Sequence, residues 1–184
     1  MSPNRRSVLA AAPVFASAAG FVCPASSASP RAVSSFEGDV KELVARASRG
    51  HETLMRGDLR GYRTAIAITD DFTLMAPFGG KPSRGADFTD ERWEAVARFF
   101  RDGRDSTFEL VSAYPSTDQV VLVAIERTHV AVGTVPAQDW ALRVTLVFRK
   151  DNGQWRLAHR HADPLVAGIA VRQAAALARN AAAA

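Results

Sequence analysis

The sequence has almost no cysteine, since Cys23 is the only one among 184 residues. Cys23 lies inside an N-terminal segment that has the composition of an export signal, so we expect cleavage to remove it. A mature chain without thiols forms no disulfide, uses no thiol chemistry and binds no metal through cysteine. The sequence also lacks a stripe of lysine and arginine with interleaved aromatic residues. Nucleic-acid binding is therefore not expected.

Acidic residues are absent from the first 36 positions, and the first one is Glu37. Arg5 and Arg6 precede an apolar run over residues 8–22, and small residues follow that run. This order is typical of a secretory signal, and the apolar run is shorter than the roughly 20 residues that span a bilayer. The paired arginines resemble a twin-arginine export signal. We therefore expect a signal peptide over residues 1–28 and an exported protein, periplasmic or secreted, that is not bound to a membrane after cleavage.

The length of the chain favours a single domain. We expect residues 29–34 to form a linker and residues 35–164 to form the domain. Residues 165–184 are rich in alanine and are expected to form a C-terminal helix or tail. The sequence contains no internal repeats that would indicate a second unit.

The first half of the domain has helical periodicity. Apolar residues recur at helical spacing over residues 36–54, with His51 on the same stripe, and Gly57 follows. Residues 58–66 and 89–103 predict two shorter helices, and residues 72–75 predict a strand between them. This half is therefore expected to supply the helices that cover a sheet.

The second half has the composition of strands. Segments rich in β-branched and aromatic residues predict four strands, over residues 107–113, 119–130, 140–149 and 154–162. Asn152 and Gly153 are typical of a hairpin turn between the last two. Helices that precede an antiparallel meander indicate an α+β fold, with the helices packed on one face of the sheet.

The predicted hairpin assigns side chains to faces, because side chains alternate along a strand. If Arg149 pairs with Gln154, one apolar face carries Trp140, Leu142, Val144, Leu146, Phe148, Trp155, Leu157, His159 and His161. The opposite, polar face carries Arg143, Thr145, Arg149, Arg156 and Arg160. The apolar face must meet the helices, so His159 and His161 are expected to point inward. A change of register by one residue would remove this expectation.

Three segments resemble the SnoaL-like proteins of the nuclear transport factor 2-like superfamily. They are residues 72–80 (FTLMAPFGG), residues 142–145 (LRVT) and residues 153–163 (GQWRLAHRHAD). The resemblance spans roughly residues 36–164. It implies a cystatin-like, ketosteroid isomerase-like cone of helices on a curved antiparallel sheet, a deep apolar pocket with a few polar groups, and commonly a homodimer. This fold hosts isomerases, cyclases, dehydratases, epoxide hydrolases and non-catalytic binders, so the resemblance leaves the activity open.

His161 is the candidate acid–base residue, because a neutral imidazole exchanges protons near physiological pH. His159 and Tyr62 are candidate hydrogen-bond donors. A structural role for His161 at the pocket rim is the alternative. The residues expected to line the ligand pocket are Met75, Phe78, Trp93 and Trp140.

A metal site at His159 and His161 would need a third ligand, and Glu126, His129 and Asp163 are available. Asp163 precedes Pro164, however, and this pair is typical of the start of a helix. Glu126 and Arg143 are explained by an ion pair between strands. Because no ligand set is complete, neither a metal nor another cofactor is predicted.

Two functions remain open from the sequence. In the first, the protein is an isomerase, cyclase or dehydratase that acts on a small, mainly apolar molecule, with His161 moving a proton. In the second, the same pocket binds its ligand without chemistry, or the protein is a dimerisation module. The expected partners are a small apolar molecule and a second copy of the chain.

Overall fold

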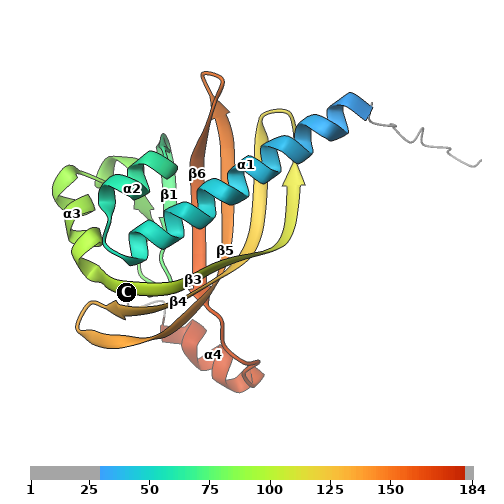
Figure 1. Ribbon diagram of the computed structural model, residues 1–184. Coiled ribbons are helices and arrows are strands. Elements are labelled where there is room, and N and C mark those ends of the chain that lie inside the picture. Colours follow the sequence, from blue (N-terminus) through green and yellow to red (C-terminus); the bar gives the residue numbers. More distant parts are fainter. Residues whose placement is uncertain (1–29, 181–184) are drawn as a thin grey trace, which may run out of the picture.

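The computed structural model describes residues 30–180. The expected signal at residues 1–28 lies outside the described residues, as do the last four alanines. The helices are α1 (Pro30–Met55), α2 (Leu59–Ala65), the 3-10 turn η1 (Gly85–Asp87), α3 (Asp90–Phe99) and α4 (Val171–Asn180). The strands are β1 (Ile68–Met75), β2 (Ser83–Arg84), β3 (Phe100–Pro115), β4 (Gln119–Val132), β5 (Val135–Asp151) and β6 (Gln154–Pro164) (Figure 1).

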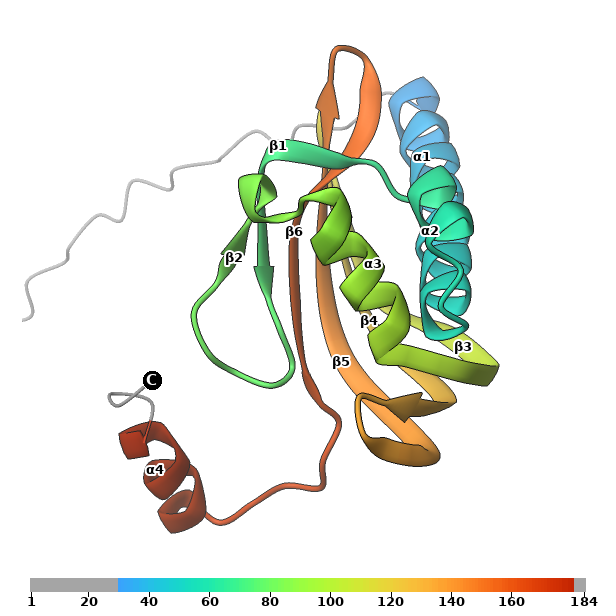
Figure 2. The ribbon, with the colours of Figure 1, turned by 90° about the vertical axis from the view of Figure 1, so that its left-hand side faces the viewer.

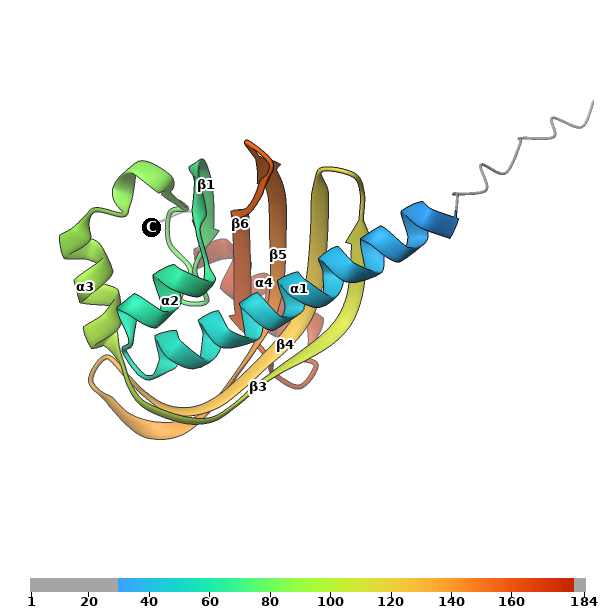
Figure 3. The same cartoon turned by 45° about the horizontal axis from the view of Figure 1, so that its top comes forward.

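The six strands form one curved sheet in the order β2-β1-β6-β5-β4-β3, and the sheet does not close into a barrel. The long strands curl around α1, which crosses the concave side (Figure 3). The α+β prediction is confirmed. The sheet is mixed rather than wholly antiparallel, because β1 pairs with β6 in parallel. Helices on the concave side and strands around them give the cone its interior.

The short helices begin where the sequence supplies a capping side chain. The Asp58 carboxylate accepts a hydrogen bond from the Gly61 amide at 2.9 Å, at the start of α2. The Thr89 hydroxyl accepts one from the Arg92 amide at 3.3 Å, at the start of α3. Each cap satisfies an amide that has no partner inside its own helix. α1 begins at Pro30, so most of the segment expected as a linker is helical.

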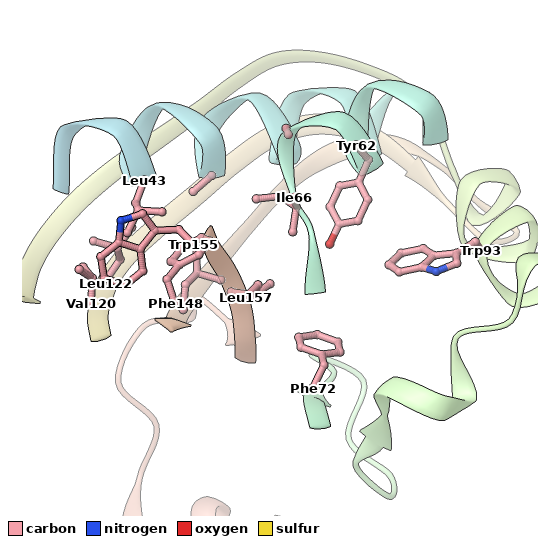
Figure 4. Packing of buried hydrophobic residues seen from close by; sticks show 13 residues of the cluster. Leu43, Tyr62, Ile66, Phe72, Trp93, Val120, Leu122, Phe148, Trp155 and Leu157 are labelled. Carbon is pink, nitrogen blue, oxygen red and sulfur yellow. The ribbon is translucent and has the colours of Figure 1, made fainter. Parts of the chain in front are cut away.

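The core lies between α1 and the concave face of the sheet. Its main cluster joins Leu43 of α1 to Phe148, Trp155 and Leu157 of the last hairpin, and Figure 4 shows these side chains packed together. The indole nitrogen of Trp155 donates a hydrogen bond to Asp39 of α1 at 3.2 Å. Burial of apolar area supplies most of the stabilisation, at about 25 cal/mol per Å².

The register of the last hairpin decides which residues point inward. Phe148 pairs with Leu157, but the neighbouring Val147 pairs with His159, so Ala158 is an extra residue that forms a β-bulge. Before the bulge, Trp155 and Leu157 face the core as expected. A bulge exchanges the two faces of the residues that follow it. The side chains after Ala158 therefore lie on the faces opposite to those predicted.

The end of the domain also differs from the prediction. Asp163 and Pro164 belong to β6 and do not start a helix, because β6 continues its pairing with β5 through both of them. The C-terminal helix α4 starts at Val171 and lies beyond the end of β6, away from α1 to α3 (Figure 2). Among residues 30–180, no helix is long and apolar enough to cross a membrane.

Candidate functional site

A buried cluster of charged side chains lies inside the cone, where α1, β4 and β6 meet. Arg160 of β6 donates two hydrogen bonds to Glu126 of β4, at 3.0 Å to Oε1 and 2.7 Å to Oε2. The Glu126 side chain is 4 % exposed and that of Arg160 is 18 % exposed. Glu126 is therefore almost completely enclosed, whereas Arg160 keeps a small exposed fraction.

His51 of α1 joins this cluster from the opposite side. Its Nδ1 lies 3.4 Å from Oε2 of Glu126, and its Nε2 lies 3.2 Å from the carbonyl oxygen of Arg127. Both ring nitrogens therefore face oxygen atoms that accept hydrogen bonds. A neutral imidazole carries only one N–H group, so it donates to one of these oxygens at a time. The tautomer of His51 therefore decides whether the Glu126 carboxylate or the Arg127 carbonyl receives the hydrogen bond.

Tyr62 of α2 completes the cluster and projects toward the interior (Figure 4). Burial raises its pKa to about 12, and the charges of Arg160 and Glu126 act on it in opposite directions. The ring of Tyr62 packs against Trp93 of α3 with the centroids 5.4 Å apart. At neutral pH, Tyr62 therefore presents an un-ionised hydroxyl group held in a fixed position.

The cluster keeps its charges in spite of burial. Burial by itself raises the pKa of Glu126, but Arg160 and His51 outweigh it, so the pKa lies below the usual value. Burial likewise lowers the pKa of Arg160, and the attraction of Glu126 more than restores it. Glu126 is therefore a carboxylate and Arg160 a guanidinium at neutral pH.

A small cavity of about 40 Å³ adjoins this cluster. Apolar side chains from α1, α2, β5 and β6 form the rest of its wall, including Leu54, Ile66, Leu146 and Leu157. Gly50 lets α1 and α2 approach each other here, because a Cβ atom would lie 2.6 Å from the Ile66 side chain. A cavity of this size holds a few water molecules or a very small ligand, whereas drug-sized pockets measure roughly 300–1,000 Å³.

The structure places the two histidines of the predicted site on the outside. His161 is exposed, and the inward position predicted for His159 and His161 is wrong because the bulge at Ala158 reverses their faces. His159 Nδ1 lies 2.6 Å from the hydroxyl of Thr73 on β1. Partial burial, followed by the nearby His161, lowers the pKa of His159. The acid–base role of His161 stays a prediction, without the inward position on which it was based.

The four residues expected to line a pocket do not converge on one cavity. Trp93 is buried in the core, whereas Met75 and Phe78 are 43 % and 55 % exposed. The ring of Phe78 lies 5.9 Å from that of Trp140. The indole nitrogen of Trp140 is buried and has no hydrogen-bond partner within residues 30–180. Of the predicted donors, only Tyr62 lies beside the buried charges.

The three expected third ligands for a metal are engaged elsewhere. Glu126 lies in the interior, and Asp163 pairs with Arg143 on the outer face. The predicted ion pair between Glu126 and Arg143 is therefore wrong, because the two side chains lie on opposite faces. His129 pairs with Asp139 at 2.9 Å. In the described part of the chain, no group of three or more histidine, cysteine, aspartate or glutamate residues is placed to hold a metal ion.

Arg160 was predicted on the polar outer face because alternation counted from the hairpin turn includes no bulge. His51 carried a usable signal, since it lies on the apolar stripe of α1 that covers the sheet. Glu126 carried a second signal. It follows Leu122 and Ala124 at every second position of β4, so it lies on the same inward face as they do. Only the bulge, which the sequence does not mark, brings Arg160 to both of them.

The fold and its interior cluster define the class of this protein, a cystatin-like or nuclear transport factor 2-like (NTF2-like) cone. The SnoaL-like domain family matches residues 44–167. The chain belongs to this family. No curated protein sequence matches it.

Solved structures share the fold at low sequence identity. An NTF2-like protein of Streptomyces avermitilis, named as a candidate dehydratase, is 16 % identical, with a TM-score of 0.57 over 72 % of this chain and 99 % of that one. A Mycobacterium tuberculosis protein of unknown function is 21 % identical, with a TM-score of 0.59 over 82 % and 90 %. The association domain of Caenorhabditis elegans CaMKII is 14 % identical, with a TM-score of 0.51 over 70 % and 98 %.

Proposed function

We propose that this SnoaL-like protein binds a very small carbonyl compound in the interior of the cone, against Arg160, Tyr62, Glu126 and His51. The observation that carries the proposal is the buried ion-paired cluster beside a cavity of about 40 Å³. Burying charged groups costs several kcal/mol per ion, and a well-packed apolar core avoids that cost. Buried charges beside a cavity are therefore candidates for a functional site.

The chemistry of the cluster favours a neutral oxygen acceptor. Arg160 has five N–H donors, and the bonds to Glu126 use two of them. Its positive charge is already balanced by Glu126, so a carbonyl oxygen fits better than a second carboxylate. The un-ionised Tyr62 hydroxyl supplies a further donor. The apolar wall formed by Ile66, Leu146 and Leu157 suits the hydrocarbon part of the ligand.

In the enzymatic form of this proposal, the protein is an isomerase, cyclase or dehydratase that removes a proton next to the carbonyl group. His51 and Glu126 share one proton-accepting unit, and Arg160 with Tyr62 stabilises the developing oxyanion. The alternative is a binder without turnover. It is favoured by the mutual pairing of Glu126 with Arg160 and His51, which occupies the base in the absence of a ligand.

Acetone, acetate and propan-2-ol form a matched set of probes, because they have the same number of heavy atoms and differ in charge and donor capacity. We expect acetone to raise the melting temperature of the untagged protein in a saturable manner, and acetate to raise it less. Tyr62→Phe and Arg160→Lys should abolish the response. Arg143→Lys, a change on the outer face, should preserve it. An equal response in all variants would overturn the proposal.

Exchange of the acetone hydrogens with deuterated solvent separates an enzyme from a binder. The enzyme is expected to accelerate this exchange, seen by NMR, and His51→Gln should return it to the buffer rate while acetone still binds. Saturable binding with exchange at the buffer rate would instead identify a binding module. Native mass spectrometry of freshly purified protein would reveal any small molecule that it retains.

We further propose that the chain is exported and dimeric. Arg5 and Arg6 before an apolar run support export by the twin-arginine route. Changing both to lysine in a fusion of residues 1–34 to a reporter should block translocation.

The half-buried row Val121, Val123 and Ile125 on the outer face of β4 supports a homodimer through the sheet. Val123→Arg should then convert a dimer to a monomer in light scattering.

A further inference from the structure

Three side chains that bind metals lie next to one another on the outer face of the sheet. His159 and His161 are alternate residues of β6, and Met75 is the last residue of β1. β1 and β6 are parallel neighbours in which Thr73 pairs with His159 and Met75 pairs with His161. Neighbouring strands lie about 4.8 Å apart, so these pairings bring the three side chains within reach of one ion.

The contacts of their neighbours fix the face of all three. Thr73 and His159 share the outer face, because the threonine hydroxyl lies 2.6 Å from Nδ1 of the histidine. Arg160, the residue between the histidines, points inward to Glu126. Its partner Leu74 packs against the core. Met75 and His161 therefore point outward with His159, and both are exposed.

Thr73 also positions the imidazole of His159. The threonine hydroxyl lies 2.6 Å from Nδ1 of His159, and in the tautomer whose Nδ1–H group donates to it, Nε2 carries the lone pair that binds an ion. Metal-binding histidines almost always donate their second ring nitrogen to such a partner. The next residue of β6 on the outer face is Asp163, which forms an ion pair with Arg143. The positive charge of Arg143 is therefore neutralised and does not repel a metal ion.

We propose that His159, His161 and Met75 form a binding site for a copper ion, Cu(I) in particular. Imidazole nitrogens suit both zinc and copper, whereas a thioether ligand selects copper in its reduced state. The set contains no carboxylate and no third histidine, which zinc sites ordinarily require. Copper is thus the metal that matches these three donors. The site is separate from the interior cluster, so it does not depend on the proposed carbonyl ligand.

Competition with a chromogenic Cu(I) chelator, under reducing and anaerobic conditions, tests the site in the untagged full-length chain. Cys23→Ser is the reference protein, because the thiol of Cys23 would itself bind Cu(I). We expect one equivalent of Cu(I) per chain. His159→Asn and His161→Asn should each weaken binding at least about tenfold. His129→Asn is the matched control, since His129 is a histidine outside this site, and its affinity should equal the reference.

Met75→Leu separates copper from other metals. Leucine preserves size and removes only the sulfur, so Cu(I) binding should weaken about tenfold while Zn(II) binding stays unchanged. Thr73→Val should weaken binding of both metals by about tenfold through loss of the orienting hydrogen bond. No binding above that of the double variant His159→Asn/His161→Asn would overturn the proposal. Unchanged Cu(I) affinity in Met75→Leu would also overturn it.

Discussion

The two faces of β6 carry the same kind of ion pair in different surroundings. On the inner face, Arg160 binds Glu126, and these side chains are only 18 % and 4 % exposed. On the outer face, Arg143 of β5 binds Asp163, and these side chains are 59 % and 42 % exposed. A surface pair contributes about 0–1 kcal/mol, whereas removing one partner of a buried pair costs about 3–5 kcal/mol. The free-energy cost of leaving a charge unpaired therefore depends on which face of the strand carries it.

Arg160→Met should have the largest effect, because it leaves Glu126 buried without its main counter-charge. We expect the free energy of unfolding to fall by about 3–5 kcal/mol in urea titrations. The double variant Arg160→Met/Glu126→Gln should recover a large part of this loss, because it buries no unpaired charge. A loss below 1 kcal/mol in the single variant would mean that the inner pair behaves like the outer one.

Alkaline pH should reveal the second largest effect, through Tyr62. Its folded-state pKa of about 12 lies above the ordinary value of 10, so its contribution to stability is complete below pH 10 and is lost as the pH rises through 12. Tyr62→Phe should therefore lose less stability than the wild type between pH 10 and pH 12. The measurement is the urea midpoint at both pH values, and parallel curves would contradict the prediction.

Acid should weaken the inner ion pair as Glu126 becomes protonated. Arg160 and His51 hold the pKa of Glu126 below its usual value of 4.5 against the opposing effect of burial. The stabilisation by Glu126 is therefore present above about pH 4.5 and is lost as the pH falls through the folded-state pKa. The difference in stability between the wild type and Glu126→Gln should shrink over this range. A difference that is constant with pH would show that the charge of Glu126 does not matter.

Arg143→Ala should have the smallest effect. It removes the outer ion pair, and Asp163 remains hydrated at the surface. We expect the free energy of unfolding to change by less than about 1 kcal/mol, and less still in high salt. The urea titrations used for Arg160→Met serve here as well. A loss comparable to that variant would contradict the distinction between the two faces.

Periodicity was enough to predict most of the fold. Helical spacing in the first half and alternation in the second half report local structure, so the order of helices and strands could be predicted. The parallel pairing of β1 with β6 could not, because it joins residues more than 80 positions apart, such as Thr73 and His159. The strand predicted over residues 72–75 also starts earlier than expected, because β1 begins at Ile68.

The candidate site was harder to predict for one local reason. Nothing in the residues around Ala158 marks a bulge, yet the faces of all later residues of β6 depend on it. Tyr62, a predicted donor, lies beside the interior cavity, whereas Arg160, predicted on the solvent side, points inward to Glu126. Trp155 and Leu157 were correctly predicted to share the inward face. Extending the same alternation over the next four residues gave His159 and His161 the wrong face.

The bulge also matters for any alignment of this protein with its relatives. A related strand that lacks the additional residue has its side chains in the opposite phase, so two columns that align without a gap can compare an interior residue with an exterior one. A gap at Ala158 should therefore be treated as an exchange of inside and outside, rather than as a neutral difference in length. Transfer of a catalytic role to Arg160 or His161 from a relative should begin by establishing which phase that relative has.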